Sequence, residues 1–333
     1  MTEFTIVPGA VVSAILTESK EETLRTIAET YLAHGRGLSV NPNSYFLRFP
    51  DKPNSRVIAL PCYLGGEVNA IGMKWIASFP DNIRTGLPRA SAVLLINDYT
   101  TGYPVACLEA AGISAARTGA SAALAAKELL GDVGPVGVSF VGAGVIAKTI
   151  LDYLQPAGLD VADVLVHDLD ASSAGHLAHY AAESFGVRAT AGTLEEALDR
   201  RLVIFATTAA QPYVPAETTL RPDQVVLNIS LRDLAPEVLL QSNNVVDDVD
   251  HCLTAQTSPH LAEQMSGARK FISGTLAELL EGTIDLDSAK AVVFSPFGLG
   301  VLDLALGNRV LREARTRGEA IVVADFIGDT RRW

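Results

Sequence analysis

A glycine-rich motif of the form GxGxxA, the run GAGVIA at residues 142–147, is the strongest chemical signal in this chain. It follows a short apolar segment and opens a helical pattern. Gly142 permits a tight turn, Gly144 lets a pyrophosphate approach the backbone, and Ala147 allows close packing of the helix on the strand. The start of the helix would offer unpaired N–H groups and a positive dipole to phosphates. The motif therefore predicts a dinucleotide site.

Asp168 ends the next apolar segment, and its distance from Gly142 along the chain is close to the spacing expected in a βαβ nucleotide unit. A carboxylate at this position accepts hydrogen bonds from both ribose hydroxyls and repels a 2′-phosphate, which favours NAD over NADP. Asp170 is an alternative for this role, although Asp168 lies nearer the strand end. The alternative for the whole motif is a glycine turn in a sheet that binds no nucleotide.

Two cations and one carboxylate are candidates for substrate chemistry. Lys74 lies in an apolar strand, on the face opposite Met73 and Trp75, and is either an edge residue that faces water or a functional cation. Arg117 is the only charge between residues 109 and 127 of an alanine-rich helix, so it must find an anion. Asp233 follows an apolar strand and is a candidate acid or base.

Small and hydroxyl-bearing residues follow other apolar strands of the same region. Ligands of parallel sheets bind outside the carboxyl ends of the strands, although each of these segments is equally explained as an ordinary turn. The residues concerned are Thr207 and Thr208, the run from Asn228 to Asp233, and the run from Ser295 to Gly298.

The composition bounds what this protein can be. The chain has 333 residues, 48% of them apolar, and a net charge of −12, which indicates two globular domains and disfavours nucleic acid and anionic membranes as partners. No apolar run reaches about 18 residues, and the N-terminus does not resemble a secretory signal. Cys62, Cys107 and Cys252 are expected to be buried thiols in a reducing compartment, so we predict a cytoplasmic protein.

No metal site is expected. His176 and His179 have no third ligand nearby in the sequence and indicate a solvated helix face, and the acidic segment 247–251 is interpreted as a turn rather than a cation site.

Hydrophobic periodicity predicts an α/β fold in two parts. Residues 10–34 and 112–130 have helical patterns, and residues 45–107 contain short apolar runs separated by turns, as in a mainly antiparallel sheet. Beyond residue 135, apolar strands alternate with helices, which predicts a parallel sheet covered on both faces. A final helix after residue 300 is expected to return to the first part.

Ordered motifs along nearly the whole chain resemble the ornithine cyclodeaminase/μ-crystallin family. They are KWI at 74–76, PDN at 80–82, GLPR at 86–89, NDYTTGYP at 97–104, ART at 116–118, GAGVIA at 142–147, ATTAAQP at 206–212, Asp233, and SPFGLGVLDLALG at 295–307. The resemblance implies an α+β substrate-binding and dimerisation domain, residues 1–117 with 302–333. It also implies an NAD-binding Rossmann-type domain, residues 118–301, and a homodimer.

The resemblance also implies roles for individual residues. Lys74 matches an active-site lysine, Arg117 an arginine that holds a substrate carboxylate near the cofactor, and Asp233 a catalytic aspartate. The substrate would be bound by Arg48, Lys74, Arg89, Arg117, Arg232 and Phe297. The cofactor would be bound by Arg117, Thr118, Gly142, Gly144, Val145, Ile146, Asp168, Thr207, Thr208, Ser230, Leu231 and Gly298.

Three segments, residues 45–50, 86–104 and 228–237, look most like the branch of this family that makes 2,3-diaminopropionate for siderophores or peptide antibiotics. That branch cleaves N-(2-amino-2-carboxyethyl)-L-glutamate oxidatively with NAD and releases 2-oxoglutarate. Its substrate has three carboxylates, which suits the additional cations Arg89 and Arg232. The alternatives are ornithine cyclisation to proline, reduction of a ketimine or imino acid, and a μ-crystallin-like nucleotide-binding protein without catalytic activity.

Overall fold

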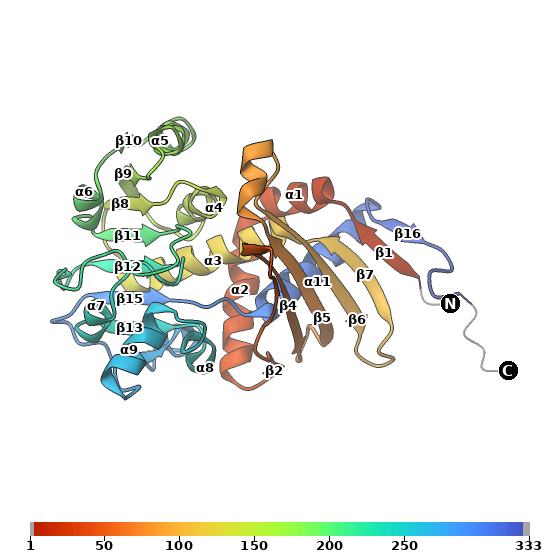
Figure 1. Ribbon diagram of the computed structural model, residues 1–333. Coiled ribbons are helices and arrows are strands. Elements are labelled where there is room, and N and C mark those ends of the chain that lie inside the picture. The colour runs from red at the N-terminus through yellow and green to blue at the C-terminus, as the bar shows by residue number, and fades with distance from the viewer. Residues whose placement is uncertain (1–2, 329–333) are drawn as a thin grey trace. The chain divides into compact units, whose positions relative to one another are not determined.

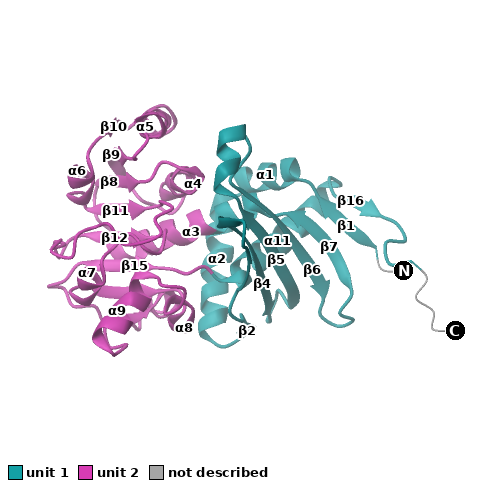
Figure 2. Ribbon diagram, in the orientation of Figure 1, with its two compact units in different colours: residues 1–117, 299–333 teal, residues 118–298 magenta. Residues whose placement is uncertain are grey.

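The computed structural model describes residues 3–328 and divides the chain into two compact units. Unit 1 contains the residues up to Arg117 and those from Leu299 onward, and unit 2 contains residues 118–298 (Figure 2). The division therefore falls at 298/299, where the sequence predicts 301/302. Helix α3 (Ala111–Leu130) contains the other division, at 117/118.

Unit 1 is built on one mixed eight-stranded sheet (Figure 1). β1 pairs with β7 in parallel, whereas all the other paired strands of the described sheet run antiparallel, as the sequence predicts. The order is β16 (Ile321–Val323), β1 (Phe4–Val7), β7 (Pro104–Glu109), β6 (Ala90–Asp98), β5 (Ala70–Ser78), β4 (Lys52–Leu64) and β2 (Ser39–Val40), and β3 (Tyr45–Phe49) also pairs with β4.

One face of this sheet is covered by the returning helix α11 (Gly300–Arg317), which packs on β4, β5 and β6 and contacts α1 and α2. This confirms the expected return of the last helix. Alternation along β5 places Lys74 on the covered face and leaves Trp75 41% exposed on the other. A short 3₁₀ helix, Pro80–Thr85, connects β5 to β6.

The predicted single helix over residues 10–34 is two helices, α1 (Gly9–Glu18) and α2 (Lys20–Gly35). The break lies at Ser19, whose backbone leaves the helical region with φ −128° and ψ 48°. The Ser19 hydroxyl donates a hydrogen bond to the Ile15 carbonyl at 2.6 Å, and the Ser19 carbonyl accepts the Thr23 N–H at 3.0 Å in the first turn of α2.

Unit 2 is a parallel eight-stranded sheet with helices on both faces (Figure 1), as predicted. Its order is β10 (Arg188–Ala191), β9 (Val161–His167), β8 (Val136–Val141), β11 (Leu202–Phe205), β12 (Val225–Asn228), β15 (Val292–Ser295), β13 (Asn243–Val246) and β14 (Ile272–Thr275). The helices are α4 (Val145–Leu154), α5 (Ala171–Phe185), α6 (Leu194–Leu198), α7 (Pro236–Leu240), α8 (Val249–Cys252), α9 (Ser258–Ser266) and α10 (Leu276–Leu280), together with most of α3.

The central strands of unit 2 are buried on both faces, so their sequences are apolar without alternation. Val203 and Phe205 of β11 pack in one core cluster with Ala197 of α6 and Leu239 of α7, and the intervening residues point to the opposite face. No helix among residues 3–328 has the length and apolar character needed to cross a membrane.

Gly72 of β5 makes the close packing of α11 on the sheet possible. A Cβ atom at this position would lie 2.6 Å from Leu304 Cδ1 and 2.7 Å from the Leu95 carbonyl oxygen of the neighbouring strand. We therefore expect Gly72→Ala to lower the free energy of unfolding by about 1–3 kcal/mol in urea titrations. The matched control is Gly175→Ala in α5, where nothing lies within 4 Å of the added Cβ. Gly175→Ala should instead raise the free energy of unfolding by about 0.5–1 kcal/mol. Equal effects of Gly72→Ala and Gly175→Ala on this free energy would contradict the packing argument.

Candidate functional site

The glycine-rich loop joins β8 to α4 in the conformation that the motif predicts. Gly142 has φ +97°, and a Cβ there would lie 2.5 Å from the Ala206 carbonyl oxygen of the segment after β11, so only glycine fits. Gly144 is the N-cap of α4, and no other atom lies within 4 Å of the Cβ that a side chain would add there. Beside it, Val145 is 72% exposed and Ile146 is half-buried.

Asp168 ties this loop to the end of β9. Its Oδ2 accepts a hydrogen bond from the Ala143 N–H at 2.7 Å, and its Oδ1 accepts one from the Asp170 N–H at 2.8 Å. Each oxygen keeps a second lone pair, so the carboxylate can still accept from ribose hydroxyls.

The rival candidate, Asp170, is committed to a different task. It is the N-cap of α5 and accepts hydrogen bonds from the backbone N–H groups of Ser172 and Ser173 and from the Ser173 hydroxyl. The Ser173 hydroxyl and these N–H groups lower the pKa of the Asp170 carboxyl. The geometry therefore favours Asp168 over Asp170 as the ribose ligand.

These residues fit the dinucleotide that the motif implies. No side chain of the described residues caps the N-terminus of α4, and the space next to Gly144 is open, so the first N–H groups of the helix are available to a pyrophosphate. A bound NAD would be held by this helix start and by Asp168.

Asp233 lies beyond β12 and is fully buried, and three hydroxyl groups donate hydrogen bonds to its carboxylate. Its Oδ1 accepts hydrogen bonds from the Thr207 hydroxyl at 2.5 Å and the Tyr213 hydroxyl at 3.0 Å, and its Oδ2 accepts one from the Ser230 hydroxyl at 2.5 Å. Burial and the Asp233 carboxylate raise the pKa of Tyr213, which keeps this phenol a donor. The arrangement holds a negative charge away from water and orients three hydroxyls around it.

The structure thus brings together three predicted residues, Thr207, Ser230 and Asp233, and adds Tyr213, which the sequence analysis missed. Thr208 is exposed and Thr118, at the start of unit 2, is half-buried. Arg232 donates to the Gln256 carbonyl at 3.1 Å and to the Ala255 carbonyl at 2.6 Å, so its guanidinium is held against a neighbouring turn.

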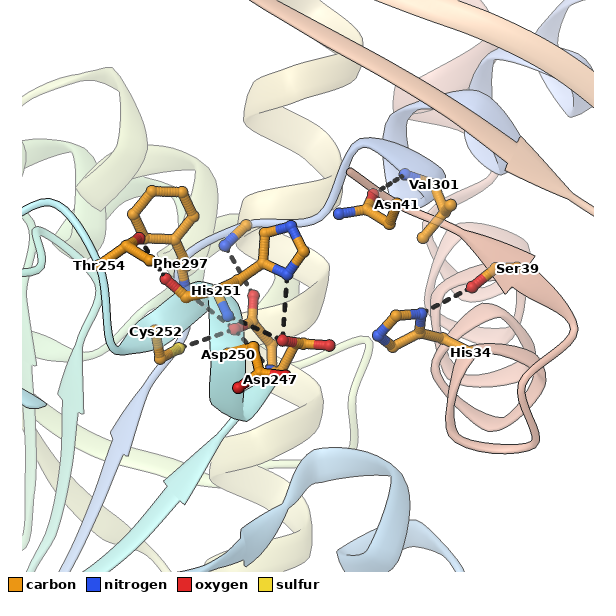
Figure 3. A network of polar contacts seen from close by, with 12 residues as sticks. His34, Ser39, Asn41, Asp247, Asp250, His251, Cys252, Thr254, Phe297 and Val301 are labelled. Atoms are coloured by element: carbon orange, nitrogen blue, oxygen red, sulfur yellow. Dashed lines mark hydrogen bonds and ion pairs between the residues drawn. The ribbon is translucent and has the colours of Figure 1, made fainter. Parts of the chain in front are cut away.

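A second buried carboxylate, Asp247 at the end of β13, fixes the loop that contains Phe297 and Gly298 (Figure 3). It accepts backbone N–H bonds from Phe297 at 2.9 Å and Gly298 at 2.6 Å, and its Oδ1 also contacts the Cys252 thiol at 3.0 Å. Next to it, His251 pairs with Asp248 at 3.0 Å, and its ring centroid lies 6.3 Å from that of Phe297. Asp247 therefore holds the backbone of two predicted ligand-binding residues, Phe297 and Gly298, in place.

In unit 1, Lys74 is the centre of a buried cluster of charges. Its Nζ donates to Asp303 Oδ2 of α11 at 2.7 Å and to the Ser114 hydroxyl of α3 at 3.0 Å, and the side chain is only 2% exposed. This excludes the alternative that Lys74 is an edge residue facing water. Burial lowers the pKa of Lys74 to about 8, an effect that Asp303 opposes and Arg117 increases.

Arg117 completes the cluster, with its Nε 3.5 Å from Asp303 Oδ1. Within the described residues neither of these two buried atoms has a hydrogen-bond partner. Two cations therefore face one carboxylate with little access to water, and an additional anion such as a substrate carboxylate would be attracted there. The sequence signal for Asp303 is an acidic residue within the otherwise apolar run GLGVLDLALG, which the sequence analysis did not use.

The other predicted arginines of unit 1 are not part of this buried cluster. Arg89 is half-buried and donates to the Ser78 hydroxyl at 2.8 Å, and burial lowers its pKa. Arg48 is exposed on β3, where its guanidinium lies 5.5 Å from the ring centroid of Phe46.

Cys62 and Cys252 are buried free thiols as expected, whereas Cys107 is only partly buried. Among residues 3–328, no group of His, Cys, Asp and Glu side chains is placed to hold a metal ion.

Comparison with known proteins identifies similar chains over nearly the full length. Residues 9–318 match the model of the ornithine cyclodeaminase/mu-crystallin family. N-((2S)-2-amino-2-carboxyethyl)-L-glutamate dehydrogenase of Staphylococcus aureus is 28% identical over 87% of this chain and 89% of that protein. Alanine dehydrogenase of Archaeoglobus fulgidus is 26% identical over 90% and 92% of the two chains. The solved structure of an archaeal alanine dehydrogenase dimer with bound NAD is 25% identical, with a TM-score of 0.87, and covers 97% of this chain and 100% of that one.

The three hydroxyl bonds to Asp233 lead to a stability prediction. In Asp233→Asn a neutral amide replaces a carboxylate that accepts all three, so we expect the free energy of unfolding to fall by about 1–3 kcal/mol. Urea titrations at neutral pH measure this. The matched control is Asp223→Asn, whose side chain is 54% exposed in an ion pair with Arg221, and which should change stability by less than about 1 kcal/mol. Indistinguishable effects would mean that the hydroxyl cluster contributes nothing to stability.

Proposed function

Since the chain belongs to the ornithine cyclodeaminase/mu-crystallin family, we propose that it is an NAD-dependent dehydrogenase acting on the carbon–nitrogen bond of a small amino acid. The observation that carries this proposal is the buried cluster of Lys74, Arg117 and Asp303, whose excess positive charge suits an α-carboxylate. The glycine-rich loop and Asp168 supply the residues for the dinucleotide.

We propose N-(2-amino-2-carboxyethyl)-L-glutamate as the substrate. The support is the Staphylococcus aureus dehydrogenase that acts on this compound, together with the number of arginines that the sequence offers to three carboxylates. Arg117 and Lys74 would bind one carboxylate, and Arg89, which is half-buried, is available to a second. A guanidinium suits this role because its planar pair of N–H groups matches the two carboxylate oxygens.

The proposed reaction is an oxidation followed by hydrolysis. Bound NAD supplies a hydride acceptor. Loss of a hydride from Cα of the glutamate moiety and of the proton on nitrogen gives an imine, to which water adds. The resulting carbinolamine breaks its C–N bond, its hydroxyl proton moves to the departing nitrogen, and the products are 2-oxoglutarate and L-2,3-diaminopropionate.

The chain's own residues bind, orient and move protons in this scheme. Lys74 and Arg117 would fix the carboxylate and thereby the direction of the Cα–H bond, which lowers the barrier by positioning. Asp233 would take up protons through the hydroxyls of Ser230, Thr207 and Tyr213, which all donate to it.

A second candidate, the oxidative deamination of a simple amino acid such as alanine, is favoured by the full-length similarity to alanine dehydrogenase. The cluster around Lys74 would bind the single carboxylate of such a substrate equally well. Ornithine cyclisation and imine reduction are further reactions that the same residues could support, and the assay below includes them.

We also propose that the protein is a homodimer. Trp75 of β5 and Val93 of β6 are direct neighbours in the sheet register, and both are about 40% exposed on the face away from α11. A similar archaeal protein is a dimer. A second copy of unit 1 would cover this apolar face.

The test of the proposed function is an assay of NADH formation by the purified protein with NAD and N-(2-amino-2-carboxyethyl)-L-glutamate. We expect NADH, 2-oxoglutarate and 2,3-diaminopropionate in equal amounts, and a loss of turnover in Asp233→Asn with NAD binding retained. Parallel reactions contain L-alanine, L-ornithine, or a cyclic imino acid with NADH. Three results would contradict the proposed reaction and indicate another one in its place. They are NADH formation with alanine alone, proline formation from ornithine without net NADH, and oxidation of NADH by the imino acid. Binding of NAD without turnover of any of them would indicate a nucleotide-binding protein.

The nucleotide site is tested by comparing two neighbouring aspartates. Asp168→Ala removes the ribose acceptor, and we expect the Kd for NAD in calorimetric titration to rise about tenfold to a hundredfold. Asp170→Ala removes only the N-cap of α5, so stability should fall by about 1 kcal/mol while the Kd stays within about twofold. If Asp168→Ala binds NAD as tightly as the unaltered protein, the ribose assignment is wrong.

A further inference from the structure

Among residues 3–328, Asp303 is the one carboxylate that forms ion pairs with both cations of the buried cluster in unit 1. Its Oδ2 lies 2.7 Å from Lys74 Nζ, and its Oδ1 lies 3.5 Å from Arg117 Nε. Asp303 is fully buried, in the first turn of α11. Without its charge, a lysine and an arginine would face each other in a nearly dry site, which is strongly unfavourable.

The bonds around Lys74 fix its ammonium in a defined direction. An ammonium has three N–H donors, and Asp303 and Ser114 accept two of them. Arg117, in contrast, is attracted to Asp303 by charge, because its Nε lies 3.5 Å from Asp303 Oδ1 and neither of these two atoms has a hydrogen-bond partner among the described residues. Asp303 thus orients Lys74 and attracts Arg117 without using the hydrogen-bonding capacity of the guanidinium.

We infer that Asp303 is a positioning residue for the proposed reaction, because it holds the Lys74 ammonium and the Arg117 guanidinium where a substrate carboxylate meets both. The inference rests on the proposed function for its kinetic test. It deepens that function by assigning Asp303 a role that acts through Lys74 and Arg117.

The electrostatic consequence follows from the groups that face Lys74. These are Asp303 from α11, Arg117 from α3 and Cys62 from β4. Burial lowers the pKa of Lys74 to about 8, and Asp303 is the main group that opposes this shift. Removal of the Asp303 charge should therefore lower the pKa of Lys74 further.

The kinetic test uses Asp303→Asn. We expect kcat/KM to fall about tenfold to a hundredfold, because the two cations that bind the substrate carboxylate lose their alignment. The inflection near pH 8 in the profile of kcat should move to lower pH, whether the reaction needs Lys74 charged or neutral. Glu313→Gln, which removes an exposed ion pair with Arg317 on the same helix, is the matched control and should leave the profile unchanged. An unmoved inflection in Asp303→Asn would overturn the inference.

A second variant keeps the inference testable if Asp303→Asn does not fold. Asp303→Glu keeps the charge but moves the carboxylate by one methylene. We expect its inflection to stay near pH 8 and its kcat to fall. A kcat equal to that of the unaltered protein would show that the position of the carboxylate is immaterial.

A measurement of stability separates this inference from the proposed function. The folded-state pKa of Lys74, about 8, lies below its ordinary value of 10.5. The unfolded chain therefore binds more protons between these values, and the free energy of unfolding should rise with pH in that window because of Lys74. In Lys74→Met this rise should be absent, and in Asp303→Asn it should begin at lower pH. An unchanged onset refutes the role of Asp303, whereas a shifted onset without turnover of any tested amino acid refutes the proposed function alone.

Discussion

The cost of burying a carboxylate governs the arrangement of the functional residues in this protein. Asp233, Asp247 and Asp303 are each at most 1% exposed, and a buried carboxylate is tolerated only when hydrogen bonds or cations compensate for the lost water. The three are compensated differently, by hydroxyls, by backbone N–H groups and by cations. Each one therefore fixes a different kind of partner.

Each of these carboxylates has at least one partner from a distant part of the sequence. Asp233 collects hydroxyls from residues 207–230, and Asp247 holds the loop that follows β15, some fifty residues further along the chain. Asp303 joins the last helix to β5 by a bond across 229 residues. Each carboxylate thus makes the geometry of a site depend on the fold of its whole unit. An error in folding elsewhere in the unit would displace the groups that bind to the carboxylate.

The sequence predicts what is determined locally. The motif at 142–147 and Asp168 could be identified because a tight turn, a helix start and a strand end are encoded by neighbouring residues. The alternation that places Lys74 and Trp75 on opposite faces of the strand could also be predicted from the sequence. The sequence could not show which face is covered, because that depends on the packing of α11 on the sheet. Tyr213, Ser114 and Asp303 were missed for the same reason: their partners lie far away in the chain. The break at Ser19 was missed because the hydrophobic periodicity continues through it. The short strands β1, β10, β14 and β16 have too few residues to show a pattern.

Leu231, in the segment between β12 and Asp233, has an energetically unfavourable backbone conformation. It has φ +78°, a backbone conformation that costs a residue with a Cβ about 1–2 kcal/mol and that glycine adopts freely. Its side chain lines, with Cys252 and Phe297, a small pocket that has no room for a water molecule. Glycine here would relieve the backbone but would remove the side chain that lines this pocket. Leu231 therefore combines an unfavourable backbone conformation with an apolar side chain beside Cys252 and Phe297.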